Sequence, residues 1–291
     1  MKLENEYISI DVTTCGGSLT SIYDKKRNEE LLYQPHLDSW SGQDIFIFPF
    51  IARLKNGYYL HNGKRYDLKN HGLLRYMIGE DESVEGENIK VVFKSDDKTL
   101  IRYPFSFEVS ITYVLNGNTI EISYDILNTG YDKLPFEMGA HPAFKLPGVK
   151  KKDEFDIRGN YIKFDKVEKL KLVELEETAS FVVDTIDYLE TDAIALSKKL
   201  FNDINTVILK ADDFKEVHLV KKDGSILTID KGNAPYIALW SDKKFGDYIA
   251  IEPWFGLPDL NEPDREIYNK PNMLFLNRNE HFKFAYKIKI N

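Results

Sequence analysis

Residues 107–126 read FEVSITYVLNGNTIEISYDI, and this stretch decides the fold class. Apolar side chains occupy every second position on both sides of Asn116-Gly117. Successive side chains of a β-strand point to opposite faces, so the alternation predicts two half-buried strands. Asn-Gly favours the positive φ angles of a tight hairpin turn. The stretch therefore predicts an antiparallel hairpin.

The same alternation recurs at both ends of the chain, over residues 8–12 and 282–290, and further turn signals stand at Asn62-Gly63 and Asp223-Gly224. Residues 167–178 fit a helix or a strand about equally well. No linker, repeat or change of composition marks a domain boundary. Many strands joined by short turns predict an all-β protein, a large antiparallel β-sandwich, with residues 1–291 as one domain.

Composition excludes several classes of protein. The chain has 18 Phe, 17 Tyr and 3 Trp, far more buryable surface than disordered chains carry. Its 39 basic and 47 acidic residues give a net charge of −8, so we expect no nucleic-acid or membrane partner. Cys15 is the only cysteine, which excludes an intrachain disulfide and a cysteine-based zinc site. We expect Cys15 to be a small buried apolar group.

Other local patterns favour ordinary explanations. The first residues lack the apolar core of a signal peptide, and no stretch approaches the roughly 20 apolar residues of a membrane span, so we expect a cytoplasmic protein. Residues 57–64 come near a phosphate-binding loop, but Arg65 stands where Ser or Thr is needed, which favours a turn. The remaining histidines lack partners at metal-ligand spacing, and no metal is expected: His36, His61, His218 and His281.

Four segments carry residues suited to chemistry: IFPFIAR at 47–53, NHGLLR at 70–75, EMGAHPAFKLP at 137–147 and YIAIEPWFGLPD at 248–259. Their key residues are Arg53, His71, His141 and Glu252 in turn.

From the residues alone, these four side chains differ in how strongly they indicate function. Arg53 is a rim charge or a group directed into a pocket, and the rim is favoured. His71 fits a simple surface turn, and His141 fits a structural or a functional histidine equally well. Glu252 closes an apolar strand, and burying an anion costs several kcal/mol unless it is paired or used. Glu252 therefore favours function.

Taken in order, the four segments resemble the aldose 1-epimerase (galactose mutarotase-like) family, and the resemblance runs from the first strand to the last. It rests on F-P-x-x-x-R, H-G-x-x-R, G-x-H-P-x-F and I-E-P-W-x-G-x-x-D, together with a closing strand pair over residues 270–291. The resemblance implies a large antiparallel β-sandwich. It also implies interconversion of the α and β anomers of a free aldose by ring opening, with no cofactor.

The family pattern also implies roles for individual residues. Glu252 would be the general base and His141 the general acid, because ring opening needs one group to take a proton and another to give one. His71 and Arg53 would hydrogen-bond the sugar oxygens. Asp203 would grip the substrate, although Asn202-Asp203 is also an ordinary turn.

Two departures separate the chain from the galactose-specific branch of the family: Ala143 follows His-Pro, and Trp254 follows Glu-Pro. The chain looks more like the less characterised sugar-epimerase branch, and Trp254 is more readily a core aromatic than a sugar platform. One alternative is a hexose 6-phosphate mutarotase in which Arg53 and Arg75 hold the phosphate. Another is a sugar-binding or sensing protein without turnover. The partner is a monosaccharide in either case, and the sequence predicts no oligomeric state.

Overall fold

The computed structural model describes residues 1–291 except 37–38, 152–153, 166–168, 177–180, 204–205 and 243–245. It also leaves the side chains of residues 149–151, 154–155, 184–186, 188 and 202–203 undescribed.

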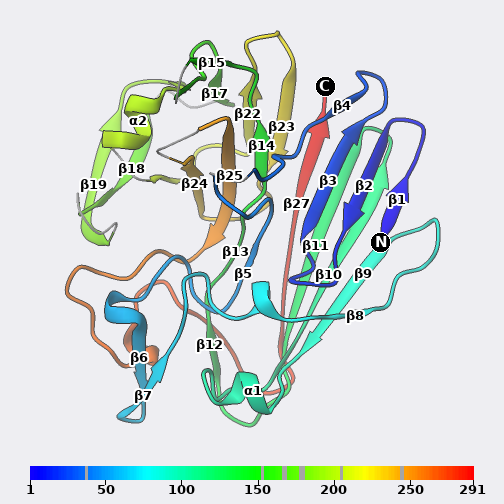
Figure 1. Cartoon of the computed structure of the whole chain (residues 1–291). Coiled ribbons are helices and arrows are strands. Elements are labelled where there is room, and N and C mark those ends of the chain that lie inside the picture. Colours follow the sequence, from blue (N-terminus) through cyan, green and yellow to red (C-terminus); the bar gives the residue numbers. More distant parts are fainter. Residues whose placement is uncertain (37–38, 152–153, 166–168, 177–180, 204–205, 243–245) are drawn as a thin grey trace.

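Two large antiparallel sheets form the body of the protein (Figure 1). The nine-stranded sheet runs in the order β20 (Ala193–Ala195), β17 (Tyr161–Phe164), β22 (Glu216–Val220), β23 (Ile226–Asp230), β27 (His281–Ile290), β11 (Thr119–Asn128), β10 (Phe107–Asn116), β9 (Ile89–Lys94), β8 (Glu80–Asp81). The eight-stranded sheet runs β19 (Val182–Leu189), β18 (Leu170–Leu175), β21 (Val207–Lys210), β24 (Tyr236–Trp240), β25 (Tyr248–Phe255), β13 (Met138–Ala140), β5 (Phe46–Ile47), and β14 (Ala143–Lys145) also pairs with β25.

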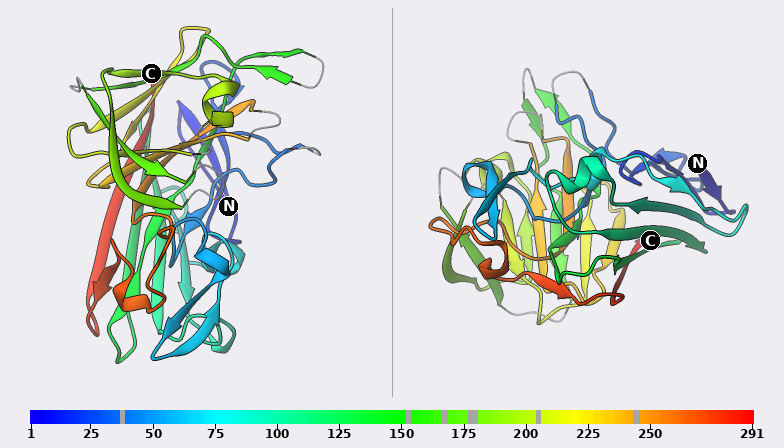
Figure 2. Two further views of the ribbon diagram at one scale, coloured as in Figure 1. Left: turned by 90° about the vertical axis from the view of Figure 1, so that its left-hand side faces the viewer. Right: turned by 90° about the horizontal axis from the view of Figure 1, so that it is seen from below.

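Smaller elements complete the fold. A four-stranded sheet joins β1 (Lys2–Glu4), β2 (Ile8–Val12), β3 (Leu19–Asp24) and β4 (Glu29–Glu30), and it lies beside β9–β11 near the C-terminal strand (Figure 2). Strand pairs are β6 (Tyr58–His61) with β7 (Lys64–Asp67), β12 (Leu134–Phe136) with β26 (Leu274–Leu276), and β15 (Val149–Lys151) with β16 (Glu154–Asp156). The helices are short: α1 (Asp97–Leu100), α2 (Lys198–Asp203), η1 (Lys55–Gly57), η2 (Leu74–Tyr76) and η3 (Ile267–Asn269).

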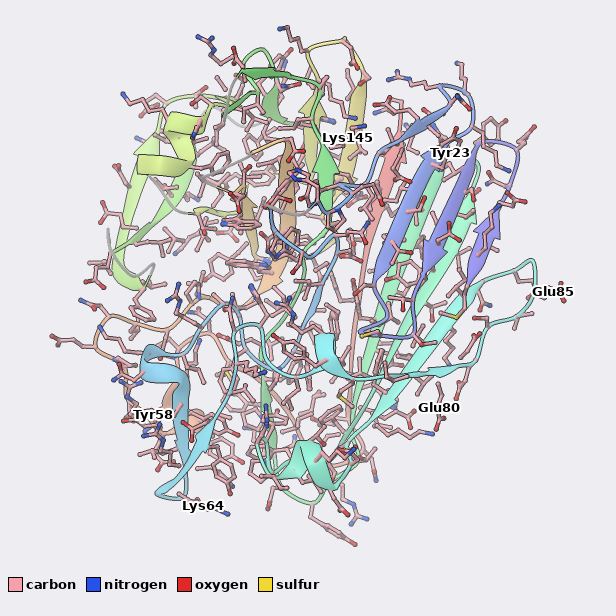
Figure 3. All side chains as sticks on the ribbon, in the orientation of Figure 1. Tyr23, Tyr58, Lys64, Glu80, Glu85 and Lys145 are labelled. Carbon is pink, nitrogen blue, oxygen red and sulfur yellow. The ribbon has the colours of Figure 1, made fainter. Side chains whose placement is uncertain are left out.

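The all-β antiparallel sandwich predicted from the sequence is confirmed. Strands β10 and β11 form the predicted hairpin around Asn116-Gly117, with Asn116 opposite Thr119. Within the ambiguous stretch 167–178, residues 170–175 form strand β18, and 167–168 and 177–178 lie outside the described residues. Residues 57–64, whose sequence is similar to a phosphate-binding loop, form the turn of the β6–β7 hairpin and its flanking residues. The labelled Tyr58 and Lys64 lie on this hairpin at one end of the molecule (Figure 3). The prediction for Cys15 is wrong, because its side chain is exposed beside Arg75.

The two faces of strand β25 have different neighbours. Ile249 and Ile251 join the main core, where the inward side chains of β2, β10, β11 and β27 meet. Ala250 and Trp254 point to the opposite face and join two smaller apolar clusters. Because side chains alternate along a strand, Glu252 shares the second face. The candidate site is built on that outer face of the eight-stranded sheet.

A buried ion pair connects this sheet to the segments that cover it. Glu137 is fully buried and bonds the ammonium group of Lys270, whose side chain is 5% exposed. The Glu137 carboxylate also accepts backbone N–H groups from Ile51 (2.9 Å) and Leu257 (3.3 Å). The carboxylate therefore links residues 47–53 with the chain that follows β25.

We expect Glu137→Gln to lower the free energy of unfolding by about 3 kcal/mol, because it leaves the Lys270 charge buried without its partner. Urea denaturation followed by circular dichroism measures the change. Arg65→Gln is the matched control, since the Arg65–Asp67 pair (2.6 Å) is exposed and its loss should leave stability unchanged. Equal stability of Glu137→Gln and the unaltered protein would contradict a structural role for this pair.

Candidate functional site

A cavity of about 330 Å³ opens on the outer face of the eight-stranded sheet. All four segments singled out in the sequence contribute to its wall. The lining residues are Trp40, Ala52, Arg53, Asn70, His71, Arg75, His141, Leu175, Thr206, Trp240, Glu252, Trp254 and Pro258. The structure therefore brings together four of the five predicted site residues.

Strand register places His141 beside Glu252. Gly139 of β13 lies opposite Trp254, and Ala143 of β14 lies opposite Ala250, so the interruption between β13 and β14 faces Glu252. His141 Nε2 lies 3.3 Å from Glu252 Oε1, and the two residues are 5% and 1% exposed. An imidazole and a carboxyl at this distance can exchange a proton.

The segments that carry Arg53 and His71 are bonded to each other. Ala52 accepts the backbone N–H of His71 (2.7 Å), and Phe48 accepts that of Leu73 (2.8 Å). Gly72 makes this approach possible, because its φ is +76° and a Cβ there would lie 2.1 Å from the Phe48 oxygen. The two segments therefore enter the cavity wall as a unit.

His71 and Arg53 occupy different depths of the cavity. His71 is buried, so the surface-turn interpretation is wrong, and its ring stands perpendicular to that of His141 with centroids 5.5 Å apart. Arg53 is exposed, and the rim position favoured from the sequence agrees with its place in the cavity wall.

All three tryptophans of the chain line the cavity. Trp254 donates its indole N–H to Glu252 Oε2 (3.1 Å), so this buried aromatic also orients the carboxyl. Gly139 leaves room for it, because a Cβ there would lie 2.5 Å from Trp254 Cδ1. Trp40 and Trp240 lie against His141, with ring centroids 4.9 and 5.6 Å away.

Sequence reasoning missed most of this aromatic wall. Period two does place Trp254 on the same strand face as Glu252, which was a usable signal. Asn70 belongs to a segment singled out in the sequence but was assigned no role there. Trp40, Trp240 and Thr206 stand outside any pattern that the sequence offered.

Burial governs the protonation of Glu252 and His141. It raises the pKa of Glu252 well above its usual value, the bond from Trp254 opposes this, and the charge of Asp44 adds to it. Burial also lowers the pKa of His141 to about 3 and that of His71 well below its usual value. The positive charge of Arg75 lowers the pKa of both histidines further. These buried surroundings therefore favour a protonated Glu252 and neutral imidazoles.

The other predicted positions lie outside this cavity or outside the described side chains. Asp203 is the last residue of α2, and its side chain is not described. The remaining histidines have other neighbours. His36 lies 3.2 Å from Asp247, His218 lies 2.9 Å from Thr228 and His281 lies 2.7 Å from Asp125. The ring of His61 lies against that of Phe105.

Among the described residues, no three or more His, Cys, Asp or Glu side chains are grouped so that they could hold a metal ion. None of the described helices is long and apolar enough to cross a membrane.

Comparison with known proteins identifies the relatives of the chain. A model of the aldose 1-epimerase family matches residues 1–274. The plasmid-encoded protein LacX of Lactococcus lactis subsp. lactis is 29% identical over 283 residues, which cover 94% of this chain and 93% of LacX. Protein YphB of Escherichia coli K12 is 25% identical over 154 residues, about half of each chain.

Two solved structures share the fold over the whole chain. A galactose mutarotase related enzyme from Lactobacillus acidophilus has a TM-score of 0.90 and 26% identity, covering 100% of this chain and 97% of its own. A galactose mutarotase-like protein from Lactobacillus casei also has a TM-score of 0.90, with 22% identity and coverage of 100% and 99%.

The raised pKa of Glu252 has a consequence for stability. A carboxyl that holds its proton more tightly when folded loses stability as pH rises above its unfolded pKa, near 4.5. Glu252→Gln removes this loss, so we expect its melting temperature to equal that of the unaltered protein at pH 4 and to exceed it at pH 8. Calorimetry at both pH values measures the difference. Glu121→Gln, at a half-buried position outside the cavity wall, is the control. The raised pKa would be contradicted if Glu252→Gln, compared with the unaltered protein at the same pH, were less stable at pH 8 than at pH 4.

Proposed function

The chain belongs to the aldose 1-epimerase family, and we propose that it interconverts the α and β anomers of an aldose by opening and closing the sugar ring. The observation that carries the proposal is the contact between His141 Nε2 and Glu252 Oε1 (3.3 Å) inside a cavity of about 330 Å³. That volume suits a single sugar ring, and the reaction needs no cofactor. A protein that only binds sugar would have no use for a buried acid–base pair.

Ring opening requires two proton transfers. The Glu252 carboxylate takes the proton from the C1 hydroxyl, and the His141 imidazolium gives a proton to the ring oxygen. The bond between C1 and the ring oxygen breaks, and C1 becomes an aldehyde. Rotation about the C1–C2 bond presents the other face of the aldehyde to the hydroxyl that held the ring. Closure then reverses both transfers, so the protein ends in the protonation state in which it began.

The pair needs one proton in total. Burial favours this proton on Glu252 and a neutral His141. That arrangement is the one the pair reaches after ring opening, when the carboxyl has gained its proton and the imidazole has lost one. Passing the proton from Glu252 to His141 across their contact prepares the pair for the closed sugar. The buried surroundings therefore favour the protonation state that the pair has when the open-chain aldehyde is present.

Other cavity residues position the sugar in this proposal. His71 and Arg53 donate hydrogen bonds to sugar oxygens, and His71 Nδ1 has no other partner in the described part of the chain. Trp40 and Trp240 supply apolar surface for the C–H face of the ring. Trp254 holds the Glu252 carboxyl through its 3.1 Å bond. Asp203 remains a proposed substrate contact on the strength of the family pattern.

A second candidate substrate is a hexose 6-phosphate. Arg53 and Arg75 both line the cavity, and no described carboxylate forms an ion pair with either guanidinium. Unpaired guanidinium groups at a cavity mouth favour a ligand with an anionic group.

Polarimetry of freshly dissolved α-glucose and α-galactose tests the reaction. We expect the protein to speed relaxation to the unchanged final rotation, and Glu252→Gln to lower kcat by at least about 100-fold because the amide cannot act as a base. His141→Asn should lower kcat similarly. His281→Asn and Glu121→Gln, both remote from the cavity, are the matched controls. Near-normal rates for Glu252→Gln would remove Glu252 as the base.

The identity of the substrate is tested by comparing glucose with glucose 6-phosphate. If the anionic substrate is correct, Arg53→Gln and Arg75→Gln should each lower kcat/KM about tenfold more for the phosphate than for the free sugar. Arg65→Gln, on the exposed β6–β7 hairpin, should change neither. An equal loss for both sugars would leave the free aldose as the substrate.

A further inference from the structure

Asp44 is a buried carboxyl for which neither the family pattern nor the cavity wall provides a use. It is 6% exposed, and its Oδ2 accepts the backbone N–H of Leu19 (3.0 Å). Its Oδ1 is buried and makes no hydrogen bond within the described residues. Burying a carboxylate is costly, and an amide or apolar side chain would fill the same space without that cost.

Strand register places Asp44 beneath His141. Ala140 pairs with Phe46, and Ala143 donates its backbone N–H to Gln43 (2.9 Å), so His141 and Pro142 span the gap opposite Asp44. The backbone N–H groups of His141 and Ile45 also favour the charged form of the Asp44 carboxyl. Asp44 therefore lies between the first residue of β3, which it bonds, and the segment that carries His141.

The side chain of Asp44 lies on the opposite face of the sheet from the cavity. Phe46 points into the main core while Ile45 and Ile47 point outward, and Asp44 shares the face of Phe46. The phenols whose pKa its charge raises come from three strands of the nine-stranded sheet: Tyr113 on β10, Tyr124 on β11 and Tyr286 on β27. These phenols stay neutral, because burial raises their pKa values well above the usual value.

Two charged residues act on Glu252 and His141 from opposite sides of the eight-stranded sheet: Asp44 from the core side and Arg75 from the cavity side. Across the sheet, the charge of Asp44 opposes ionisation of Glu252. On the cavity side, Arg75 opposes protonation of His141, the His71 ring stands against it, and the indole of Trp254 stabilises the Glu252 carboxylate. Asp44 is thus the negative counterpart of Arg75.

We propose that Asp44 is a positioning residue for the His141–Glu252 pair: its carboxylate fixes the interruption between β13 and β14, and its negative charge retains the shared proton in the pair. The inference rests on the proposed function, because a shared proton matters only if the pair transfers protons. A purely structural Asp44 would hold the backbone without affecting the proton affinity of the pair.

The test is the pH dependence of kcat for Asp44→Asn, measured by polarimetry. Removing a negative charge lowers the proton affinity of the pair, so the alkaline limb of the profile should move to lower pH by about one unit. Asp24→Asn is the matched control, because Asp24 is also a buried aspartate that accepts backbone N–H groups, from Lys26 (2.9 Å) and Arg27 (3.1 Å). Its profile should not move. If Asp44→Asn lowered kcat equally at every pH and the alkaline limb of the profile did not move, Asp44 would have only a structural role.

A second measurement on the unaltered protein covers the case in which Asp44→Asn does not fold. Burial raises the pKa of Asp44 to about 6, so the carbon-13 NMR signal of its carboxyl should titrate with a midpoint at this pH. The nitrogen-15 signals of the His141 ring should shift with the same midpoint if the two groups are coupled. Titration of Asp44 with no response at His141 or Glu252 would overturn the inference. Because this readout needs no turnover, it still decides the role of Asp44 if no aldose is converted and the proposed function fails.

Discussion

The carboxylate of Glu137 lies where three of the four cavity-forming segments meet, and the geometry of the site depends on it. It bonds Lys270 and the backbone N–H groups of Ile51 and Leu257, while its own backbone N–H donates to Pro49 (2.8 Å). The segment with His71 is bonded in turn to residues 47–53. A charge buried this completely keeps its orientation only with all its partners in place, so the ion pair selects one arrangement of these loops.

The low polarity around Glu252 and His141 has two opposite effects on their electrostatics. It disfavours charge on Glu252 and His141 separately, as the directions of their pKa shifts indicate. It also strengthens every remaining electrostatic interaction, so that Asp44 beneath the sheet and Arg75 above it act on the pair over longer distances than in water. The protein places these groups on opposite sides of one strand layer, which keeps the inner charge away from the cavity.

The sequence predicted those features that depend on local periodicity. Alternation over residues 107–126 predicted the β10–β11 hairpin, and alternation along residues 248–254 put Glu252 on a different face from Ile251. The sequence favoured a surface position for His71 and a buried position for Cys15, and the structure shows the reverse. The burial of each residue depends on segments that are distant in the sequence. Asp44 and Trp40 carry no periodic signal, since their positions follow from how β5 pairs with β13 and how the preceding loop crosses the cavity.

The concentration of tryptophan at the cavity gives the protein an optical property. Trp40, Trp240 and Trp254 are the only indoles in the chain, and all three line the same wall. Trp40 and Trp240 are only half-buried, and Trp254 bonds the Glu252 carboxyl, which is the general base in the proposed reaction. The tryptophan emission of the folded protein therefore originates entirely at this site. Native tryptophan fluorescence reports changes in this cavity with no added label and no contribution from a tryptophan elsewhere in the chain.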